Sequence, residues 1–268
     1  SLQNYLNFDG NAVGGFINTN DFAAGSGGFQ IYFKTNSSAY NLYGNSISFY
    51  DFSSVDPNIQ NEGATVQTIW FPFKNGNTHG ANGILNINGN SGTAQGPLTF
   101  NGAISALDAN IATRAINVSG PNAVIFNGVI SDFSSSGKMA VTQLGSGTTT
   151  LAANNTFTGG LTITAGTVSS TAAQGFGNGG STVSIGAAGT ANVTLAADLN
   201  VNNVFTGAGT LTVSGSTGTP NFNNASALNG FTGTFNVNTS GSKKAALTTA
   251  GGNIGSGATV NIASGATL

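Results

Sequence analysis

The sequence predicts an all-β fold, a right-handed parallel β-helix (β-solenoid) of roughly 10 to 13 coils with at most one short helix. Three observations indicate this fold class. Short segments alternate apolar and polar residues, turns rich in glycine and asparagine separate them, and several segments echo one another. In Gly145–Val168, for example, Leu161, Ile163 and Val168 stand at apolar positions with threonines between them. This alternation is typical of short strands with one buried face.

The clearest internal echo predicts the length of one coil. The segment Leu98–Ser105 (LTFNGAIS) returns as Val124–Ser131 (VIFNGVIS). The offset between the two copies lies within the range of about 20 to 45 residues that solenoid repeats occupy, so it suits one turn of a solenoid. Two weaker echoes return at nearly three times that offset: Phe157–Gly159 with Phe231–Gly233, and Ser181–Ile185 with Ala258–Ile262. A sandwich needs unlike edge and centre strands, so the repetition favours stacked coils.

The composition fits a stack of uncharged strands. Only 5% of the 268 residues are charged, against about 25% in ordinary soluble domains, and 41 are glycine. Apolar residues still make up 39%, including 18 phenylalanines, which is enough to form a core and argues against disorder. Uncharged polar residues form ladders along a parallel stack, whereas like charges would repel one another.

Charge and cysteine content exclude several classes of function. Six Lys and Arg against eight Asp and Glu give a net charge of −2, which offers no basic field for nucleic acid. The absence of cysteine excludes disulfides and thiolate metal sites. No transmembrane helix is expected, because no run of about 18 apolar residues occurs. No signal-like segment opens the sequence, so an exported protein would appear here as a mature or trimmed chain.

We expect a single β-solenoid over residues 1–268, with aromatic-rich N-terminal coils or a cap at 1–96 and repeat-containing coils at 97–268. Early strands are expected at Phe29–Phe33 and Ile47–Phe49, where turn residues flank alternating aromatic and aliphatic side chains. Later strands are expected at Val193–Leu195, Leu211–Val213 and Phe235–Val237.

Two segments carry other signals. Val66–Trp70 is the most apolar run, and Pro57 and Pro72 on either side predict a short or edge strand. Ser105–Asn117 is the only candidate helix, of one or two turns, because its first residue is a capping serine with Asp108 three positions later. The pattern leaves helix and non-helical structure equally open for this segment.

Aromatic residues crowd the N-terminal part of the chain, from Tyr5 to Phe52. Core packing and a cap that shields the first open strand edge are the favoured interpretation. A platform on which sugars stack is the alternative, and Tyr40, Tyr43 and Tyr50 are then the candidate ligand-stacking residues.

Residues suited to catalysis are scattered. The carboxylates are Asp9, Asp21, Asp51, Asp56, Glu62, Asp108, Asp132 and Asp198. They form no adjacent or alternate pair, and carbohydrate cleavage needs two facing carboxylates. The only histidine, His79, stands in a glycine- and asparagine-rich loop and is expected to be a solvated turn residue. Asp51, Asp56 and Glu62 are more typical of turn capping than of a calcium site. We therefore expect no catalysis, no cofactor and no metal site.

One segment of the sequence is similar to a known family of repeats. Gly145–Val168 resembles the autotransporter-associated β-strand repeat, also called the passenger-associated transport repeat. The positions that fit its pattern are Gly145, Gly147, Thr148, Thr150, Leu151, Asn155, Thr156, Phe157, Thr158, Gly159, Gly160, Ile163, Gly166 and Thr167. Leu98–Ser105 and the closing GATV and GATL runs are similar to flanking parts of such proteins. A second copy at Asn229–Leu268 departs from the pattern, because Gly233 is not followed by a second glycine.

The resemblance implies a right-handed parallel β-helix outside a Gram-negative-type cell, and it carries no catalytic residues to transfer. We therefore expect an extracellular or cell-surface location. The favoured function is structural, as a stalk, matrix or fibre subunit that self-associates head-to-tail or joins other surface components. The expected assembly edges are Leu6, Phe8, Val260, Ile262 and Leu268. The sequence also stops in mid-strand, so we expect it to continue in the gene or to dock.

Three other functions remain open. The first is adhesion or glycan binding through the N-terminal aromatics. The second, less favoured, is a polysaccharide-cleaving β-helix enzyme. The third is an ice-binding surface, suggested by Thr-x-Thr pairs that begin at Thr148, Thr162, Thr210 and Thr232. The intervals between these pairs are too uneven in sequence for a regular lattice.

Overall fold

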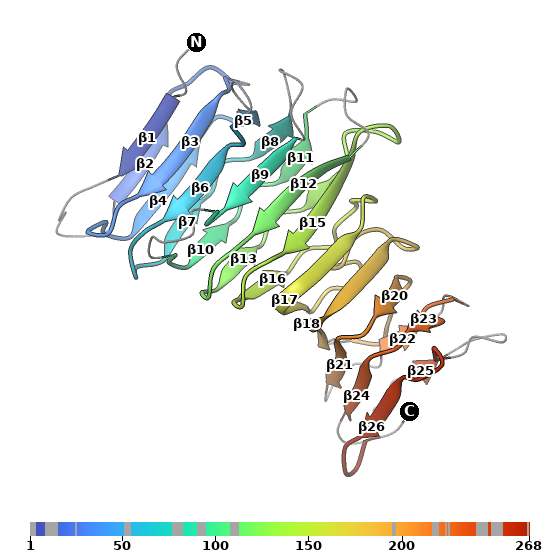
Figure 1. Ribbon diagram of the computed structural model, residues 1–268. Helices are drawn as coiled ribbons and strands as arrows, with labels where there is room; N and C mark the ends of the chain where they lie inside the picture. Colours follow the sequence, from blue (N-terminus) through green and yellow to red (C-terminus); the bar gives the residue numbers. More distant parts are fainter. Residues whose placement is uncertain are drawn as a thin grey trace.

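The computed structural model confirms the all-β fold: parallel strands stack as a β-solenoid, with the first and last strands at opposite ends (Figure 1). The structure describes residues 4–8, 16–24, 26–50, 55–76, 83–89, 95–107, 113–194, 197–215, 220–222, 224, 226–239, 246–247, 254–266 and 268. Every pairing of strands among these residues is parallel. Each strand therefore bonds to its equivalents in the coils above and below.

Two long ladders share one sheet. The first ladder joins β1 (Asn4–Phe8), β3 (Phe29–Phe33), β6 (Asn58–Asn61), β9 (Ile84–Ile87), β12 (Thr113–Val118), β15 (Lys138–Gln143), β17 (Leu161–Ser170), β18 (Thr182–Thr194), β20 (Val204–Gly207) and β23 (Gly230–Phe231). The second joins β2 (Phe16–Asn20), β4 (Tyr40–Gly44), β7 (Gln67–Ile69), β10 (Leu98–Phe100), β13 (Val124–Phe126), β16 (Thr148–Leu151), the later halves of β17 and β18, β21 (Thr210–Gly215), β24 (Thr234–Thr239) and β26 (Thr259–Ile262). The two ladders meet because β17 and β18 each run through both.

Shorter strands close the third side of the coils. A four-stranded sheet contains β5 (Ile47–Tyr50), β8 (Phe73–Gly76), β11 (Ile104–Ala106) and β14 (Ile130–Ser131). A three-stranded sheet contains β19 (Leu199–Asn200), β22 (Pro220–Phe222) and β25 (Ala246–Leu247). The three sides enclose an interior of apolar side chains that runs along the stack.

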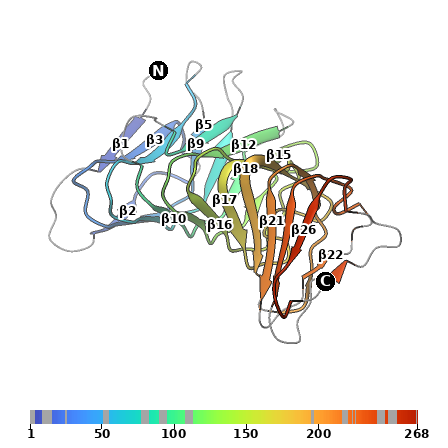
Figure 2. The same ribbon diagram turned by 60° about the horizontal axis from the view of Figure 1, so that its bottom comes forward.

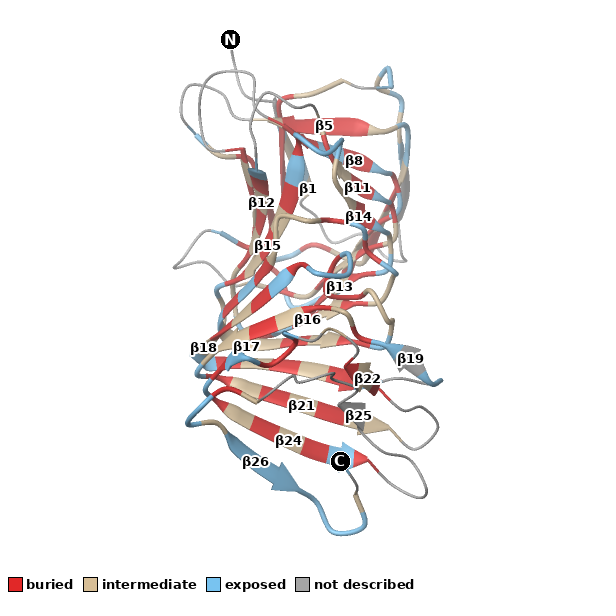
Figure 3. Ribbon diagram, turned by 90° about the vertical axis from the view of Figure 1, so that its right-hand side faces the viewer, coloured by how far each residue is buried: buried red, intermediate tan, exposed pale blue. Residues whose placement is uncertain are grey.

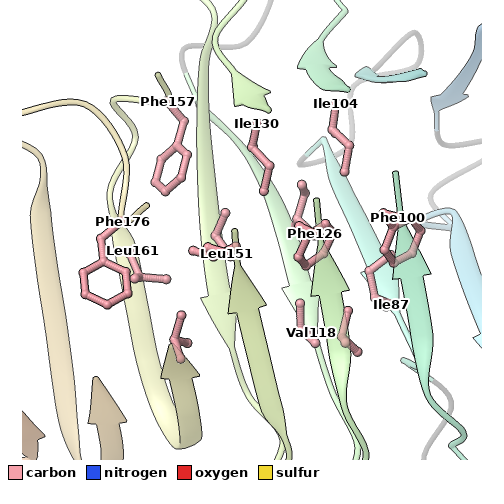
Figure 4. Packing of buried hydrophobic residues seen from close by; sticks show 14 of the residues in the cluster. Ile87, Phe100, Ile104, Val118, Phe126, Ile130, Leu151, Phe157, Leu161 and Phe176 are labelled. Atoms are coloured by element: carbon pink, nitrogen blue, oxygen red, sulfur yellow. The ribbon is translucent and has the colours of Figure 1, made fainter. Parts of the chain in front are cut away.

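The echo of the FNG segment is one coil, as the sequence predicted. Phe100 pairs with Phe126 on the second ladder, and Ile104 pairs with Ile130 on the third side. Inside the coil the two phenylalanine rings stack with centroids 5.0 Å apart (Figure 4). The motif therefore repeats because each of its residues meets its own copy one level away.

The weaker echoes do not mark equivalent positions. Phe157 precedes β17, whereas Phe231 lies inside β23; Ile185 lies on the first ladder and Ile262 on the second. Coil length explains the difference, because Thr149 pairs with Val168 across a short coil and Ile69 pairs with Phe100 across a much longer one. A fixed offset cannot hold over several coils of such unequal length.

The structure also decides the two ambiguous segments. Of Val66–Trp70, only β7 is a strand; it is short, as predicted, but it is not an edge strand, since β4 and β10 pair with it on both sides. The candidate helix is wrong where it is described: β11 and β12 occupy its ends, and residues 108–112 lie outside the described part. Ser105 needs extended backbone to pair with Lys74 and Ser131.

Side chains alternate as expected. In β17, Leu161, Ile163 and Val168 are buried, while Thr162 and Thr164 are exposed. The same alternation occurs on other strands of the stack, such as β12, β15 and β21, whereas β26 at the end is exposed throughout (Figure 3). Among the described N-terminal aromatics, Phe29, Phe33, Tyr40 and Phe49 are buried in this interior and Phe8 and Phe22 pack against it. In the described residues, no helix has the length and apolar character needed to cross a membrane.

Candidate functional site

The N-terminal end of the solenoid is an open coil. Strand β1 pairs with β3, and β2 pairs with β4, but no described strand pairs with their outer edges. Between them lies a hollow of about 350 Å³ whose lining includes four buried apolar residues of the next two coils: Ile31, Leu42, Ile47 and Phe71. The apolar interior is therefore accessible at this end.

Two of the predicted edge residues line this hollow. Leu6 and Phe8 point inward from β1 and are half-buried against the core. The ring of Phe8 stacks on Phe33 at 5.2 Å between centroids and contacts Tyr40 at 5.1 Å. Leu6 and Phe8 therefore lie at the N-terminal end of the column of inward-facing apolar side chains. The described residues that pack against them belong to the core below.

At the C-terminal end the column of inward-facing apolar side chains also ends without a described strand to cover it. In β26, Val260 pairs in register with Phe235, and Ile262 with Val237. Phe235 and Val237 are fully buried, yet Val260 is 38% exposed and Ile262 51% exposed. The same inward column is exposed at its last level because no described strand covers it. Leu268, the fifth predicted edge residue, is 39% exposed.

The three end strands themselves lack the features that usually block strand addition. Proteins protect edge strands with charged side chains, prolines or bulges. The sequences of β1 (NYLNF), β2 (FINTN) and β26 (TVNI) contain no charged residue and no proline. These edges are therefore chemically suited to accept another parallel strand.

The predicted stacking residues have different environments. Tyr40 is buried among the rings of Phe8 and Phe33, so it does not face solvent. Tyr50 packs against the Cα of Gly27, where an added Cβ would lie 2.0 Å from the tyrosine ring. Only Tyr43 belongs to an exposed aromatic surface.

Tyr43 stacks on Trp70, a residue that the sequence analysis did not select. Their centroids are 5.4 Å apart with an interplanar angle of 8°, and Trp70 is 44% exposed. The indole Nε1 donates a hydrogen bond to Oδ1 of Asn41 at 3.2 Å. Trp70 belongs to the apolar run Val66–Trp70, but it directly follows the buried Ile69, and the alternation of a strand therefore places it outside.

Two of the described acidic residues, Asp132 and Glu62, have structural partners. Asp132 accepts hydrogen bonds from the Met139 amide at 2.7 Å and the Thr158 hydroxyl at 2.7 Å. Glu62 pairs with Lys34 at 3.1 Å. No group of three or more metal-ligating side chains occurs within the described ranges. His79, Asp9, Asp51 and Asp108 lie outside those ranges, so the proposed calcium cluster is not described.

The comparisons with known proteins agree with the repeat resemblance. Residues 141–169 match the passenger-associated-transport-repeat model, and this segment contains all of Gly145–Val168. The matched repeat is an autotransporter-passenger repeat and not a known catalytic family. Comparison with curated proteins and with solved structures finds no match.

Proposed function

We propose that this chain is an extracellular structural protein of a bacterial surface, a β-helical rod that serves as a stalk, matrix or fibre subunit. The passenger-type repeat supports a secreted or surface-displayed location. One observation supports the structural role most strongly: no described strand covers the apolar column at either end of the rod, and the end strands contain no charged residue.

In this proposal the rods join head-to-tail. Strand β26 of one copy continues the second ladder into β2 of the next copy, as it does within the chain between β24 and β26. Val260 and Ile262 then enter the hollow lined by Leu6 and Phe8. Such a contact joins two different surfaces and does not close on itself, so it produces filaments. It also buries apolar area, worth about 25 cal/mol per Å².

Charge placed on the open column tests this assembly. The double variant Val260→Lys, Ile262→Lys puts two ammonium groups where the next copy would bury apolar side chains, at a large desolvation cost. Light scattering after size-exclusion chromatography should show assemblies of the wild type that grow with concentration. The double variant should elute as a monomer.

Val129→Lys is the matched control, because Val129 is also 38% exposed but lies on the side of the rod. This control should assemble like the wild type. A wild-type chain that stays monomeric at the highest concentrations would contradict head-to-tail assembly, and so would equal loss of assembly in both variants.

Glycan binding at the Tyr43–Trp70 pair is a second candidate function. Exposed stacked aromatic rings offer an apolar face to sugar rings, and the Nε1–Asn41 hydrogen bond holds the indole in place. Trp70 is the only tryptophan, so its fluorescence reports on this surface directly. Binding to a glycan array should require Trp70 and should survive Phe133→Ala, a change at another exposed ring. An array without hits, or hits unaffected by Trp70→Ala, would refute it.

The proposal includes no catalysis and no cofactor. Its support is the scatter of carboxylates in the sequence and the structural partners of Asp132 and Glu62.

A further inference from the structure

Six threonines form a continuous file on the outside of the second ladder. The strand registers pair each one with the next, from β16 through the later halves of β17 and β18 to β21, β24 and β26. The file consists of Thr148, Thr167, Thr190, Thr210, Thr234 and Thr259. These strands lie side by side in the C-terminal half of the rod (Figure 3). The same residue type thus recurs at six successive levels.

A second polar file runs beside the first, two residues further along each strand. Its members are Thr150, Ser169, Asn192, Thr212, Asn236 and Asn261. Neighbouring levels are about 4.8 Å apart and residues two apart on a strand are about 6.6 Å apart, so the two files form a regular grid.

The threonines of the first file lie on the outward side of their strands. None of these six hydroxyls forms a hydrogen bond with the described part of the chain, and all six residues are half-buried or exposed. The inward neighbour Thr149 behaves differently, because its hydroxyl donates to Oε1 of Gln143 in the interior. The outer hydroxyls are therefore available to a ligand or to water.

The grid is uncharged, and its first file is threonine at every level. The strand segments that carry it contain no charged residue. Threonine is β-branched, so few side-chain rotamers are open to it, and a file of threonines repeats one arrangement of methyl and hydroxyl groups. On the second ladder, β13, β10, β7 and β4 precede β16. The positions equivalent to Thr148 there are Ala123, Pro97, Val66 and Ala39, so the threonine file begins at β16.

We propose that this threonine face binds the surface of crystalline ice. An ice surface presents uncharged water oxygens at a fixed repeat in two directions. A file of threonine hydroxyl and methyl groups, beside a second file of hydroxyl and amide groups, can meet such a surface at many points at once. Charged side chains would hold their own hydration water and would resist the contact. The strand ladder sets the repeat along the rod, and the alternation of the strands sets it across the rod.

Spacing in the sequence conceals this regularity. The pairs at Thr148 and Thr210 belong to the face, whereas the pair at Thr162 lies on the first ladder. Coils of different length separate residues that occupy the same position at successive levels, since the coil from Thr148 to Thr167 is shorter than the coil from Thr210 to Thr234. The threonines are therefore unevenly spaced along the sequence but lie one strand apart in the structure.

Ice binding by the threonine face can be tested with the whole chain, with polycrystalline ice as the probe. Thermal hysteresis and inhibition of ice recrystallisation should both be present in the wild type and lost in Thr210→Lys, which puts a long charged side chain in the middle of the file. Thr210→Val and Thr210→Ser separate the roles of the hydroxyl and the methyl group, and each should reduce the hysteresis without affecting the fold.

Thr142→Lys is the matched control, because Thr142 is a half-buried, outward residue of the first ladder. This variant should keep full ice activity, and circular dichroism should show the wild-type β signal in both lysine variants. Absence of hysteresis and recrystallisation inhibition in the folded wild type overturns the proposal. Equal loss of activity in Thr142→Lys and Thr210→Lys overturns the assignment to this face.

Discussion

At the scale of single residues, buried asparagines hold the corners of the coils. Asn155 is fully buried; its Oδ1 accepts the Ile130 amide at 2.8 Å, and its Nδ2 donates to the Gly175 carbonyl at 2.7 Å. Asn75 and Asn203 donate to backbone carbonyls of adjacent segments in the same way. Asparagine suits this position because it carries both a donor and an acceptor on a short side chain. These residues therefore replace the backbone pairing that is lost where strands end.

Replacement of Asn155 by alanine tests this role. Asn155→Ala leaves the Ile130 amide and the Gly175 carbonyl buried without partners, and each such group costs about 1–3 kcal/mol. We expect the free energy of unfolding in urea to fall by about 2–4 kcal/mol. The neighbouring Asn154 is exposed, and Asn154→Ala should change the stability by less than about 1 kcal/mol. Equal effects of the two changes would show that the corner hydrogen bonds do not stabilise the coil.

Glycine is required at one position of the repeated FNG motif for steric reasons. A Cβ on Gly128 would lie 2.0 Å from the Gly102 carbonyl oxygen, and a Cβ on Gly102 would lie 2.0 Å from that of Phe71. The asparagines before them form their own ladder, since Nδ2 of Asn127 donates to Oδ1 of Asn101 at 2.7 Å. The motif thus combines an inward phenylalanine, an outward amide ladder and a close backbone contact.

At the scale of elements, aromatic columns link successive coils. Phe49, Phe73, Phe100 and Phe126 form a chain of ring contacts with centroids 5.0–5.8 Å apart, and Phe176, Phe205, Phe222 and Phe235 form another at 5.8–6.2 Å. Phe157, Leu151 and Ile130 occupy the interior between the two columns (Figure 4). Each coil is therefore stabilised mainly by its two neighbours, as in other solenoids.

Truncation of one ring should have a local effect. Phe126 is 1% exposed and stacked on Phe100, so Phe126→Ala removes a full core side chain and should cost about 3–5 kcal/mol. Amide hydrogen exchange should accelerate in β10, β13 and β16 and stay unchanged in β24. Phe133→Ala, at a ring that is 54% exposed, is the control. Acceleration spread evenly over the whole chain would contradict nearest-neighbour stabilisation.

At the scale of the whole molecule, alternation and repetition were sufficient to predict the architecture. The period of two in β17 and the FNG echo identified strands, burial and one coil. Packing between distant residues was not visible in the sequence. Arg114, for instance, occupies an inward position of β12 and is fully buried, although charged residues are expected outside.

The candidate sites were predicted only in part, for the same reason. Val260 and Ile262 belong to an alternating strand, and alternation identified them as part of the apolar column. The stacking of Trp70 on Tyr43 and the threonine file depend on register between coils of unequal length. Sequence offsets alone do not give that register.

In the proposed head-to-tail assembly, the two ends of the rod form the contact between successive subunits. Strands β1 and β2 at one end and β26 at the other are separated by the full length of the stack (Figures 1 and 2). Eleven strands follow one another on the second ladder from β2 to β26. At about 4.8 Å per strand, one subunit adds about 50 Å to a continuous ladder.

Electron cryomicroscopy of the concentrated chain tests the central claim most directly. We expect unbranched filaments in which strands repeat every ~4.8 Å along the axis and subunits repeat every ~50 Å, with β26 of one copy beside β2 of the next. Single unassembled rods at all concentrations, or assemblies joined through their side faces with both ends free, would contradict it.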